Sequence, residues 1–380
     1  MAPRRGGPRP GPPQHHRPLT NVRRTDTSSY WQETPVPHAD RLERDLTVDA
    51  VVVGGGITGI TAALLLKQAG QKVALIERER FAAVDTGRTT AHLTAVTDAR
   101  LHDLARRFGP AAARAVWDAG CAALGQIASL VRAKEIACDF RWLPGHLHLP
   151  LADATAAKAD ELKREAAEAG RLGIDATYAP RIPGFGVPGV IFPRQALFHP
   201  RRYLAGLLRL IPGNGSHVFE QTEADEIAGN PVMVRCGAHR IRAGYLVMAT
   251  HNPLMGKTGL IEATLFQGRL ALYTSYALSA TLPEGTLPEG LFWDTADPYD
   301  YLRVERGEGR ELAIFGGCDH KTGQVTDTLA VFAELERKFR RYAAHPTIGH
   351  RWSGQVINPD DGLPYIGETA ERQFAATGFG

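Results

Sequence analysis

The sequence contains no long hydrophobic run and few cysteines. No apolar stretch among its 380 residues approaches the roughly 18 residues of a membrane-spanning helix, so no membrane span is expected. The four cysteines, Cys121, Cys138, Cys236 and Cys318, lie far apart in the chain. This spacing is typical of reduced thiols rather than of a disulfide framework, and it predicts a cytoplasmic protein.

Acidic side chains are missing from the first 24 residues, although this stretch is rich in arginine. The net charge of +3 comes from it, because acidic residues outnumber basic ones in the rest of the chain. The folded part therefore gives no reason to expect a nucleic-acid partner. The abundance of proline, glycine and arginine predicts that residues 1–28 form a disordered basic tail. Arg4-Arg5 is followed by no apolar segment, so an export signal is not expected.

The stretch from Asp49 to Glu77, DAVVVGGGITGITAALLLKQAGQKVALIE, is predicted to form a strand, a helix and a second strand. Gly54, Gly56 and Gly59 have G-x-G-x-x-G spacing, which allows a tight turn, approach of a pyrophosphate and close packing of helix on strand. The helix N-terminus offers unpaired N–H groups to phosphates. Glu77, at the end of the second strand, can accept hydrogen bonds from ribose hydroxyls and would repel a 2′-phosphate. The stretch therefore predicts binding of FAD or NAD.

Two other patterns are interpreted as structural. Gly184, Gly186 and Gly189 repeat the glycine spacing, but prolines interrupt them and no strand precedes, so we expect a loop. His146 and His148 lie two residues apart on a predicted strand, and two histidines alone do not make a metal site, so we expect no metal.

The middle of the chain departs from the alternation of strand and helix. Residues 140–149 are predicted to form a hairpin around Pro144-Gly145, and residues 217–241 to form short antiparallel strands. Residues 245–249 are predicted to form a separate buried strand. We therefore expect an α/β fold in which a Rossmann-like FAD- or NAD(P)-binding domain carries an inserted antiparallel-sheet substrate domain of α+β character. The predicted nucleotide domain comprises residues 29–137, 195–255 and 345–380, and the predicted substrate domain residues 138–194 and 256–344.

Several motifs together resemble one enzyme family. They are the stretch above, FHPRRYLAGLLR at 198–209, YLVMATHNP at 245–253 and DGLPYIG…FAATGFG at 361–380. From residue 30 to the end, the chain resembles the FAD-dependent oxidoreductases of the D-amino-acid oxidase superfamily, which includes glycine and sarcosine oxidases. SYW at 29–31, TGRTTAHLT at 86–94, SYAL at 275–278 and RWSGQ at 351–355 resemble a bacterial subgroup that also has a C-terminal Rieske domain, which is absent here.

The resemblance implies which residues bind FAD. Thr89, Thr90 and Ala91 would follow the pyrophosphate and ribityl chain, and the backbone of Ala224 would meet the adenine. The complete set of implied positions is Gly54, Gly56, Ile57, Thr58, Gly59, Glu77, Arg78, Gly87, Thr89, Thr90, Ala91, Ala224, Ala249, Thr250, Pro364, Gly367, Gly378 and Gly380.

The chain departs from the family pattern in three places. Val356 occupies the position of an arginine that pairs with the substrate carboxylate in the amino-acid oxidases, so simple amino acids are expected to be poor substrates. His92 replaces a lysine that is usual in the subgroup. The sequence stops at Gly380, where relatives begin the last helix of the flavin domain, so we expect a C-terminally truncated domain with weakened FAD binding.

The resemblance implies oxidation of a C–H bond next to an amine or hydroxyl, with hydride transfer to the flavin. Electrons would pass to O2 or to an iron–sulfur domain or protein. The catalytic residues are not identified by the sequence, and the candidates for the substrate face are Arg269, Tyr273, Tyr276, Tyr301 and His320. An NAD-dependent dehydrogenase and a non-catalytic truncated flavin fold are the alternatives.

Overall fold

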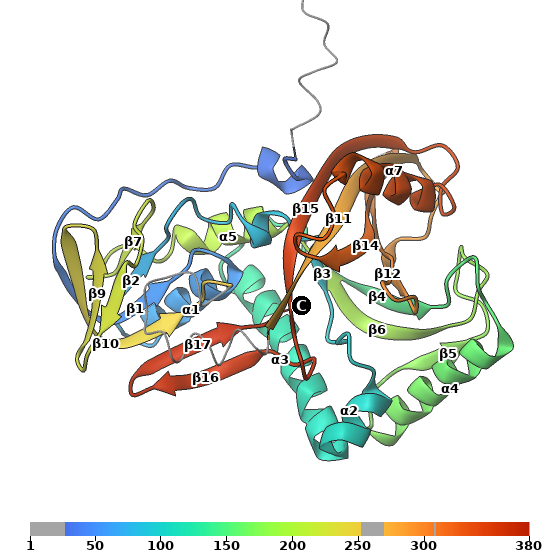
Figure 1. The fold of residues 1–380 in the computed structure, drawn as a ribbon, viewed down its shortest axis with the longest axis horizontal. Coiled ribbons are helices and arrows are strands. Elements are labelled where there is room, and N and C mark those ends of the chain that lie inside the picture. Colours follow the sequence, from blue (N-terminus) through green and yellow to red (C-terminus); the bar gives the residue numbers. More distant parts are fainter. Residues whose placement is uncertain (1–26, 252–269, 308, 380) are drawn as a thin grey trace, which may run out of the picture.

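The computed structural model describes residues 27–251, 270–307 and 309–379 and places them in two β-sheets that lie side by side (Figure 1). The first sheet forms the left half of the view, and the second sheet forms the right half. This arrangement confirms the expected mixed α/β fold. In the described part of the chain, no helix combines the length and the apolar character that crossing a bilayer requires.

The first sheet has the strand order β16-β17-β10-β1-β2-β7. Strands β17, β10, β1, β2 and β7 are parallel, whereas β16 is antiparallel to β17, and β9 joins β8 to the start of β10. Its strands are β1 (Leu46–Val53), β2 (Val73–Ile76), β7 (His217–Phe219), β8 (Glu226–Ala228), β9 (Val232–Cys236), β10 (His239–Met248), β16 (Tyr365–Ala370) and β17 (Gln373–Thr377).

Helices α1 (Ile57–Gln68) and α5 (Pro200–Leu208) cover one face of this sheet. Ile60 and Leu64 of α1 and Tyr203 and Leu207 of α5 are buried in the same hydrophobic cluster as the strand residues beneath them. The apolar run predicted as a strand at residues 73–76 forms β2 with those bounds, and all four of its residues are buried. Parallel strands covered on both faces are expected to be apolar throughout, as β2 is.

The second sheet has the order β15-β11-β14-β13-β12-β4-β6-β3, and β5 pairs with β6. Its neighbouring strands are antiparallel except for the β12–β4 pair. They are β3 (His92–Leu93), β4 (Arg141–His148), β5 (Thr177–Ala179), β6 (Gly189–Leu197), β11 (Leu270–Pro283), β12 (Gly290–Asp294), β13 (Tyr301–Gly307), β14 (Arg310–Lys321) and β15 (Thr347–Pro359).

Helix α7 (Thr328–Phe339) covers one face of the second sheet, where Phe332, Leu335 and Phe339 are buried against β11 and β14. At the opposite end of the sheet, α4 (Ala156–Arg171) packs on β6 and on α2 (Leu101–Phe108). Helix α3 (Pro110–Ala133) runs between the two halves of the molecule in Figure 1. Two short 3-10 turns, η1 (Tyr30–Glu33) and η2 (Asp85–Gly87), lie near the junction of the sheets.

Two predicted strand assignments are wrong. The expected hairpin at residues 140–149 is one strand, β4, in which Pro144-Gly145 lies at a register shift against β6 rather than in a turn. The expected separate strands at 239–241 and 245–249 are one strand, β10, which pairs with β1 from Ile241 to Met248. In both cases pairing with a distant strand keeps the chain extended through residues whose local preference favours a turn.

The sheets also divide the chain differently from the predicted domains. We expected residues 345–380 to belong to the nucleotide domain, but β15 pairs with β11 along its length and so belongs to the second sheet. Only β16 and β17 of this region join the first sheet. Residues 195–197 are likewise the end of β6 in the second sheet.

The contact between α1 and β1 yields a first prediction. A Cβ atom on Gly59 would lie 1.9 Å from the carbonyl oxygen of Gly54, so Gly59→Ala must displace the helix. We expect the free energy of unfolding to fall by about 2–3 kcal/mol, measured by urea denaturation. Gly125→Ala in α3 is the matched control, because a Cβ there meets nothing within 4 Å, and it should gain up to about 1 kcal/mol. Equal stability of the two variants would contradict this account of Gly59.

Candidate functional site

The functional residues expected from the sequence gather at one edge of the first sheet. Because β1, β2, β10 and β17 are parallel, their carboxyl ends lie at the same edge. Gly54 follows β1, Glu77 follows β2, Ala249 follows β10 and Gly378 follows β17. Ligands of open parallel sheets bind outside this edge.

The glycines after β1 form a cradle that side chains would fill. Gly54 has φ +113° and donates its N–H to the carbonyl of Ile76 at 2.9 Å, and a Cβ there would lie 2.3 Å from the oxygen of Ala249. A Cβ on Gly56 would lie 3.2 Å from the hydroxyl of Thr86. The same hydroxyl accepts the N–H of Ile57 at 3.2 Å, so an oxygen atom already occupies the N-terminus of α1. The N–H groups at the N-terminus of α1 suit the oxygens of a phosphate.

Glu77 is held rigidly at the end of β2. Its carboxylate accepts the N–H of Gly55 at 2.6 Å through one oxygen and the N–H of Glu79 at 2.8 Å through the other. Its own carbonyl accepts the N–H of Thr222 at 2.9 Å, which brings the segment containing Ala224 alongside. Arg78 is on the surface and forms an ion pair with Glu79 at 3.8 Å.

The loop at residues 82–91, which contains η2, crosses from the first sheet to the second. A Cβ on Gly87 would lie 2.3 Å from the oxygen of Ala82, so the loop folds closely on itself. Thr89 accepts the N–H of Ala91 at 3.0 Å, and Thr90 lies 3.2 Å from the ring nitrogen of His92. Ala91 is buried with φ +57°, a conformation that costs an L-residue about 1 kcal/mol or more.

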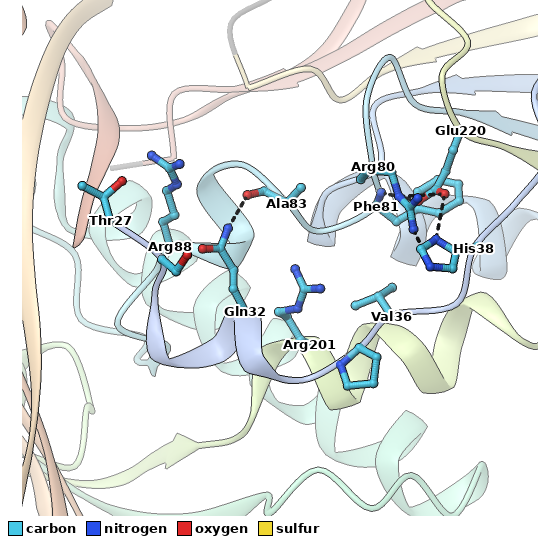
Figure 2. A pocket seen from close by; sticks show the side chains of 12 residues that line it. Thr27, Gln32, Val36, His38, Arg80, Phe81, Ala83, Arg88, Arg201 and Glu220 are labelled. Carbon is cyan, nitrogen blue, oxygen red and sulfur yellow. Dashed lines mark hydrogen bonds and ion pairs between the residues drawn. The ribbon is translucent and has the colours of Figure 1, made fainter. Parts of the chain in front are cut away.

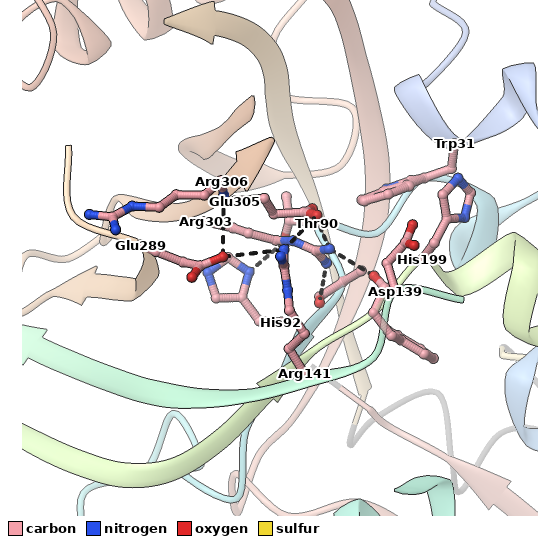
Figure 3. Close-up of polar contacts among 12 residues, drawn as sticks. Trp31, Thr90, His92, Asp139, Arg141, His199, Glu289, Arg303, Glu305 and Arg306 are labelled. Carbon is pink, nitrogen blue, oxygen red and sulfur yellow. Dashed lines mark hydrogen bonds and ion pairs between the residues drawn. The ribbon is translucent and has the colours of Figure 1, made fainter. Parts of the chain in front are cut away.

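Arg303 of β13 secures this loop from the second sheet (Figure 3). It is fully buried, donates to the carbonyls of Ala91 at 2.7 Å and Phe198 at 2.8 Å, and forms an ion pair with Glu305. Burial lowers the pKa of its guanidinium. Burial and the nearby charge of Arg303 together lower the pKa of His92 to about 3, so His92 is neutral at physiological pH.

The substrate-face candidates divide between the two faces of the second sheet. Tyr276 points to α7, where the centroids of its ring and the Phe332 ring lie 5.1 Å apart. Its hydroxyl lies 3.0 Å from Nε2 of His320. Tyr301 shares the opposite face with His92, whose ring centroid lies 5.9 Å away. Tyr273 belongs to that face by strand alternation, and it is paired with Val356. Arg269 lies outside the described residues, as does Gly380.

A hydrogen-bonded chain extends from Tyr301. The hydroxyl of Ser275 donates to Asp319 at 2.5 Å and lies 2.6 Å from the hydroxyl of Tyr301. Because the Ser275 proton goes to Asp319, Tyr301 donates to Ser275, and its oxygen keeps a free acceptor position. Beside it, Tyr299 donates to Asp98 at 3.0 Å.

The remaining expected residues lie around the same edge. Ala249 donates its N–H to Val53 at 2.8 Å, and Thr250 follows it. The hydroxyl of Thr377 donates to the carbonyl of His251. Gly367 pairs with Ala375 in the β16–β17 hairpin, and Pro364 precedes that hairpin.

The two histidines of β4 have structural partners. His146 stacks on Phe292, and its Nδ1 lies 3.1 Å from the carbonyl of Leu291. The Nδ1 of His148 lies 2.7 Å from the carbonyl of Leu149. Burial lowers the pKa of both rings to about 4. Across the residues that the structure describes, no three His, Cys, Asp or Glu side chains converge as a metal site would require.

Sequence reasoning missed Thr86, Arg303 and Asp319. Thr86 belongs to the TGRTTAHLT motif, and its position next to Gly87 could have suggested a role near the phosphates. No local signal identifies Arg303 or Asp319, because the two carbonyls that Arg303 binds and the serine that binds Asp319 lie far away in the sequence.

Asp319 gives a prediction on pH. Burial raises the pKa of the Asp319 carboxyl from 3.8 to about 6, so this carboxyl holds its proton more firmly in the folded protein than in the unfolded chain. Its contribution to stability is present below the unfolded pKa and is lost as pH rises through the folded value. The parent should therefore lose stability as the pH rises, whereas Asp319→Asn has no titrating group at this position. The free energy of unfolding of Asp319→Asn minus that of the parent should rise by about 2 kcal/mol between about pH 4 and pH 7. Urea denaturation at both pH values measures it, and a constant difference would contradict the assignment.

Relatives cover nearly the whole chain. The profile of the family described as FAD dependent oxidoreductase matches residues 49–380. A Bacillus subtilis (strain 168) protein, YhfW, named as a Rieske 2Fe-2S iron-sulfur protein, is 30% identical over 92% of this chain and 69% of its own length. The gamma-glutamylputrescine oxidoreductase of Escherichia coli (strain K12) is 26% identical over 90% of this chain and 82% of its own.

Solved structures share the fold. The L-proline dehydrogenase from P. horikoshii superposes with a TM-score of 0.67 at 18% identity, covering 89% of each chain. The glycine oxidase from Geobacillus kaustophilus superposes with a TM-score of 0.63 at 18% identity, covering 88% of this chain and 89% of its own.

The family match extends over most of the chain and includes the glycine cradle, Glu77 and both sheets. It identifies FAD as the cofactor in place of the nicotinamide alternative. The chain belongs to the family of FAD-dependent oxidoreductases.

Proposed function

We propose that this FAD-dependent oxidoreductase holds the ADP half of FAD at the carboxyl edge of the first sheet and oxidises an amine or alcohol at the facing second sheet. The observation that carries the proposal is the loop at residues 82–91, which joins the glycine cradle to the tyrosine-bearing face. It contacts the N-terminus of α1 through Thr86 and the second sheet through Arg303. When bound, FAD would accept a hydride from a C–H bond next to nitrogen or oxygen.

The residues present fit the ADP half of FAD. Gly54 and Gly59 let the turn pack closely against Ala249 and α1, and a Cβ on Gly56 would meet only the Thr86 hydroxyl within 4 Å. The N–H of Thr58 at the start of α1 would bind the phosphates, together with the N–H of Ile57, which the Thr86 hydroxyl accepts here. Each oxygen of Glu77 accepts one backbone N–H and keeps a lone pair for a ribose hydroxyl. The other residues that we assign to FAD binding are Arg78, Gly87, Ala224, Ala249 and Thr250, with Thr89, Thr90 and Ala91 along the pyrophosphate and ribityl chain and Pro364, Gly367 and Gly378 near the flavin end.

The second sheet supports an amine donor without an α-carboxylate. The free acceptor position of Tyr301 can take an N–H or O–H of the substrate, and Tyr273 lies on the same face. Val356 beside Tyr273 cannot pair with a carboxylate. Arg303, the cation that β13 places on this face, is bound by two carbonyls and Glu305. The similarity to the relative named gamma-glutamylputrescine oxidoreductase supports an amine donor.

The electrons would leave the reduced flavin to O2 or to an iron–sulfur protein. The similarity to the protein named as a Rieske protein supports the second acceptor. The rate of flavin reoxidation, measured by stopped flow, distinguishes the two acceptors. The rate with O2 alone is compared with the rate with an oxidised Rieske protein, and a reduced Rieske protein serves as the control.

Glu77 yields a prediction on cofactor binding. Glu77→Ala removes the ribose acceptor and leaves the N–H of Gly55 unpaired, so FAD should bind about 10–100-fold more weakly. Flavin absorbance after dialysis, and fluorescence titration of the apoprotein, measure the loss. Glu79→Ala is the control, because that side chain is mostly exposed and should leave FAD binding unchanged. Retention of flavin by Glu77→Ala at the parent level would show that Glu77 does not bind the ribose.

Val356 yields a prediction on substrate. Simple amines and alcohols should reduce the flavin, whereas glycine, sarcosine and D-amino acids should reduce it at least about tenfold more slowly for lack of a carboxylate partner. Anaerobic bleaching of the flavin absorbance across both panels measures this. Val356→Arg should shift the preference toward amino acids. Rapid reduction of the parent by a small amino acid would defeat the assignment, and no reduction by either panel would defeat the proposed function.

A further inference from the structure

Motifs that lie far apart in the sequence converge on the loop at residues 82–91. The SYW motif at 29–31 lies in the lead-in before β1, and the RWSGQ motif at 351–355 lies in β15. Trp31 and Trp352 are both buried, at 1% and 0% exposure. Each nevertheless directs its indole N–H to a backbone carbonyl of the loop.

Most of the loop's carbonyls are held by side chains from elsewhere in the chain. The donors are Arg201 to Ala82 at 2.8 Å, Gln32 to Ala83 at 3.0 Å, Ser29 to Gly87, Trp352 to Arg88 at 2.6 Å, Trp31 to Thr89 at 2.6 Å and Arg303 to Ala91 at 2.7 Å. Figure 2 shows the bond from Gln32 to Ala83 beside a surface hollow of about 530 Å³ that Arg88 and Arg201 also line. Figure 3 shows Trp31 and Arg303 together, with the guanidinium 5.0 Å from the indole ring.

These bonds fix the orientation of the loop. The C=O and N–H of one peptide unit point in opposite directions, so holding successive carbonyls fixes the peptide planes. The donors come from the lead-in, α5 and the second sheet, while Thr86 of the same loop reaches the N-terminus of α1. Carbonyl oxygens drawn toward these donors are kept from the anionic pyrophosphate, which they would otherwise repel.

We propose that Trp31, Trp352 and Arg303 are positioning residues for FAD, which act by holding the 82–91 loop in its cofactor-binding conformation before FAD arrives. The lead-in at residues 29–32 is then part of the cofactor site, although it contributes no residue to the G-x-G-x-x-G motif. The proposal rests on the assignment of FAD to the carboxyl edge. By linkage, a lead-in that favours FAD binding is itself stabilised when FAD binds.

Packing alone would also bury these tryptophans, so the test removes the N–H and keeps an aromatic ring, the smaller phenyl ring of phenylalanine. Trp31→Phe and Trp352→Phe each delete one donor to the loop. Trp117→Phe is the matched control, because it makes the same change in a different hydrophobic cluster. There the centroids of the Trp117 and Phe192 rings lie 5.8 Å apart. The 380-residue apoprotein, stripped of flavin, is titrated with FAD by fluorescence, and its thermal midpoint is measured with and without FAD.

We expect each of the two variants to bind FAD about tenfold more weakly, and Trp117→Phe to remain within about twofold of the parent. FAD should protect the 27–34 segment from limited proteolysis in the parent and less so in Trp31→Phe. A lowered midpoint of the apoprotein with unchanged FAD affinity would overturn the proposal, because packing alone predicts that outcome.

Two further variants keep the test decisive if a tryptophan variant does not fold. Ser29→Ala removes only the hydroxyl that donates to Gly87. Arg303→Lys keeps a cation beside Glu305 but replaces the two nitrogens that donate to the carbonyls of Ala91 and Phe198 by a single one. Both should weaken FAD binding, and unchanged affinity in both would overturn the proposal. A parent apoprotein that does not bind FAD would instead overturn the cofactor site itself.

Discussion

The approach of α1 to the end of β1 is the constraint on which the rest of the site depends. The space between Gly59 and Gly54 admits no side chain, and the space beside Gly54 is bounded by the carbonyl of Ala249 at the end of β10. This contact fixes where the helix N-terminus lies relative to three strand ends. Gly55 extends the same constraint to the next strand, because a Cβ there would lie 2.4 Å from Phe81 and 2.9 Å from Glu77. A methyl group added at Gly59 would displace α1, and the N–H groups at its N-terminus would then move away from the carboxylate of Glu77.

Features encoded within a short window were predictable from the sequence. The glycine turn after β1, helix α1 and strand β2 depend on apolar spacing and glycine, and all of them lie in the stretch from Asp49 to Glu77. The glycine cradle and Glu77 are close in sequence, so their proximity follows from one strand–helix–strand unit.

Features set by pairing between distant segments were not predictable. Pro144-Gly145 is a turn by local preference, yet β6 and β12 pair with β4 on either side and hold it extended. Tyr273 and Tyr276 both looked like substrate-face residues. They lie three residues apart, so alternation puts them on opposite faces, and the pairing of β11 with β14 and β15 determines which of the two faces α7. Since a shift of one residue exchanges the two faces of a strand, no argument from composition could have separated them.

The joining of the two sheets explains why an arginine is buried at their boundary. Removing a guanidinium from water is costly, and the lowered pKa of Arg303 expresses that cost. Two carbonyls, Glu305 and the face of Trp31 offset this cost, although the buried Nε of Arg303 has no hydrogen-bond partner among the described residues. Phe198 leads into α5 on the first sheet, and Ala91 ends the loop that leads into β3 on the second. One planar side chain thus fixes two of the segments that cross between the sheets, because two separate nitrogens of its guanidinium donate to the two carbonyls.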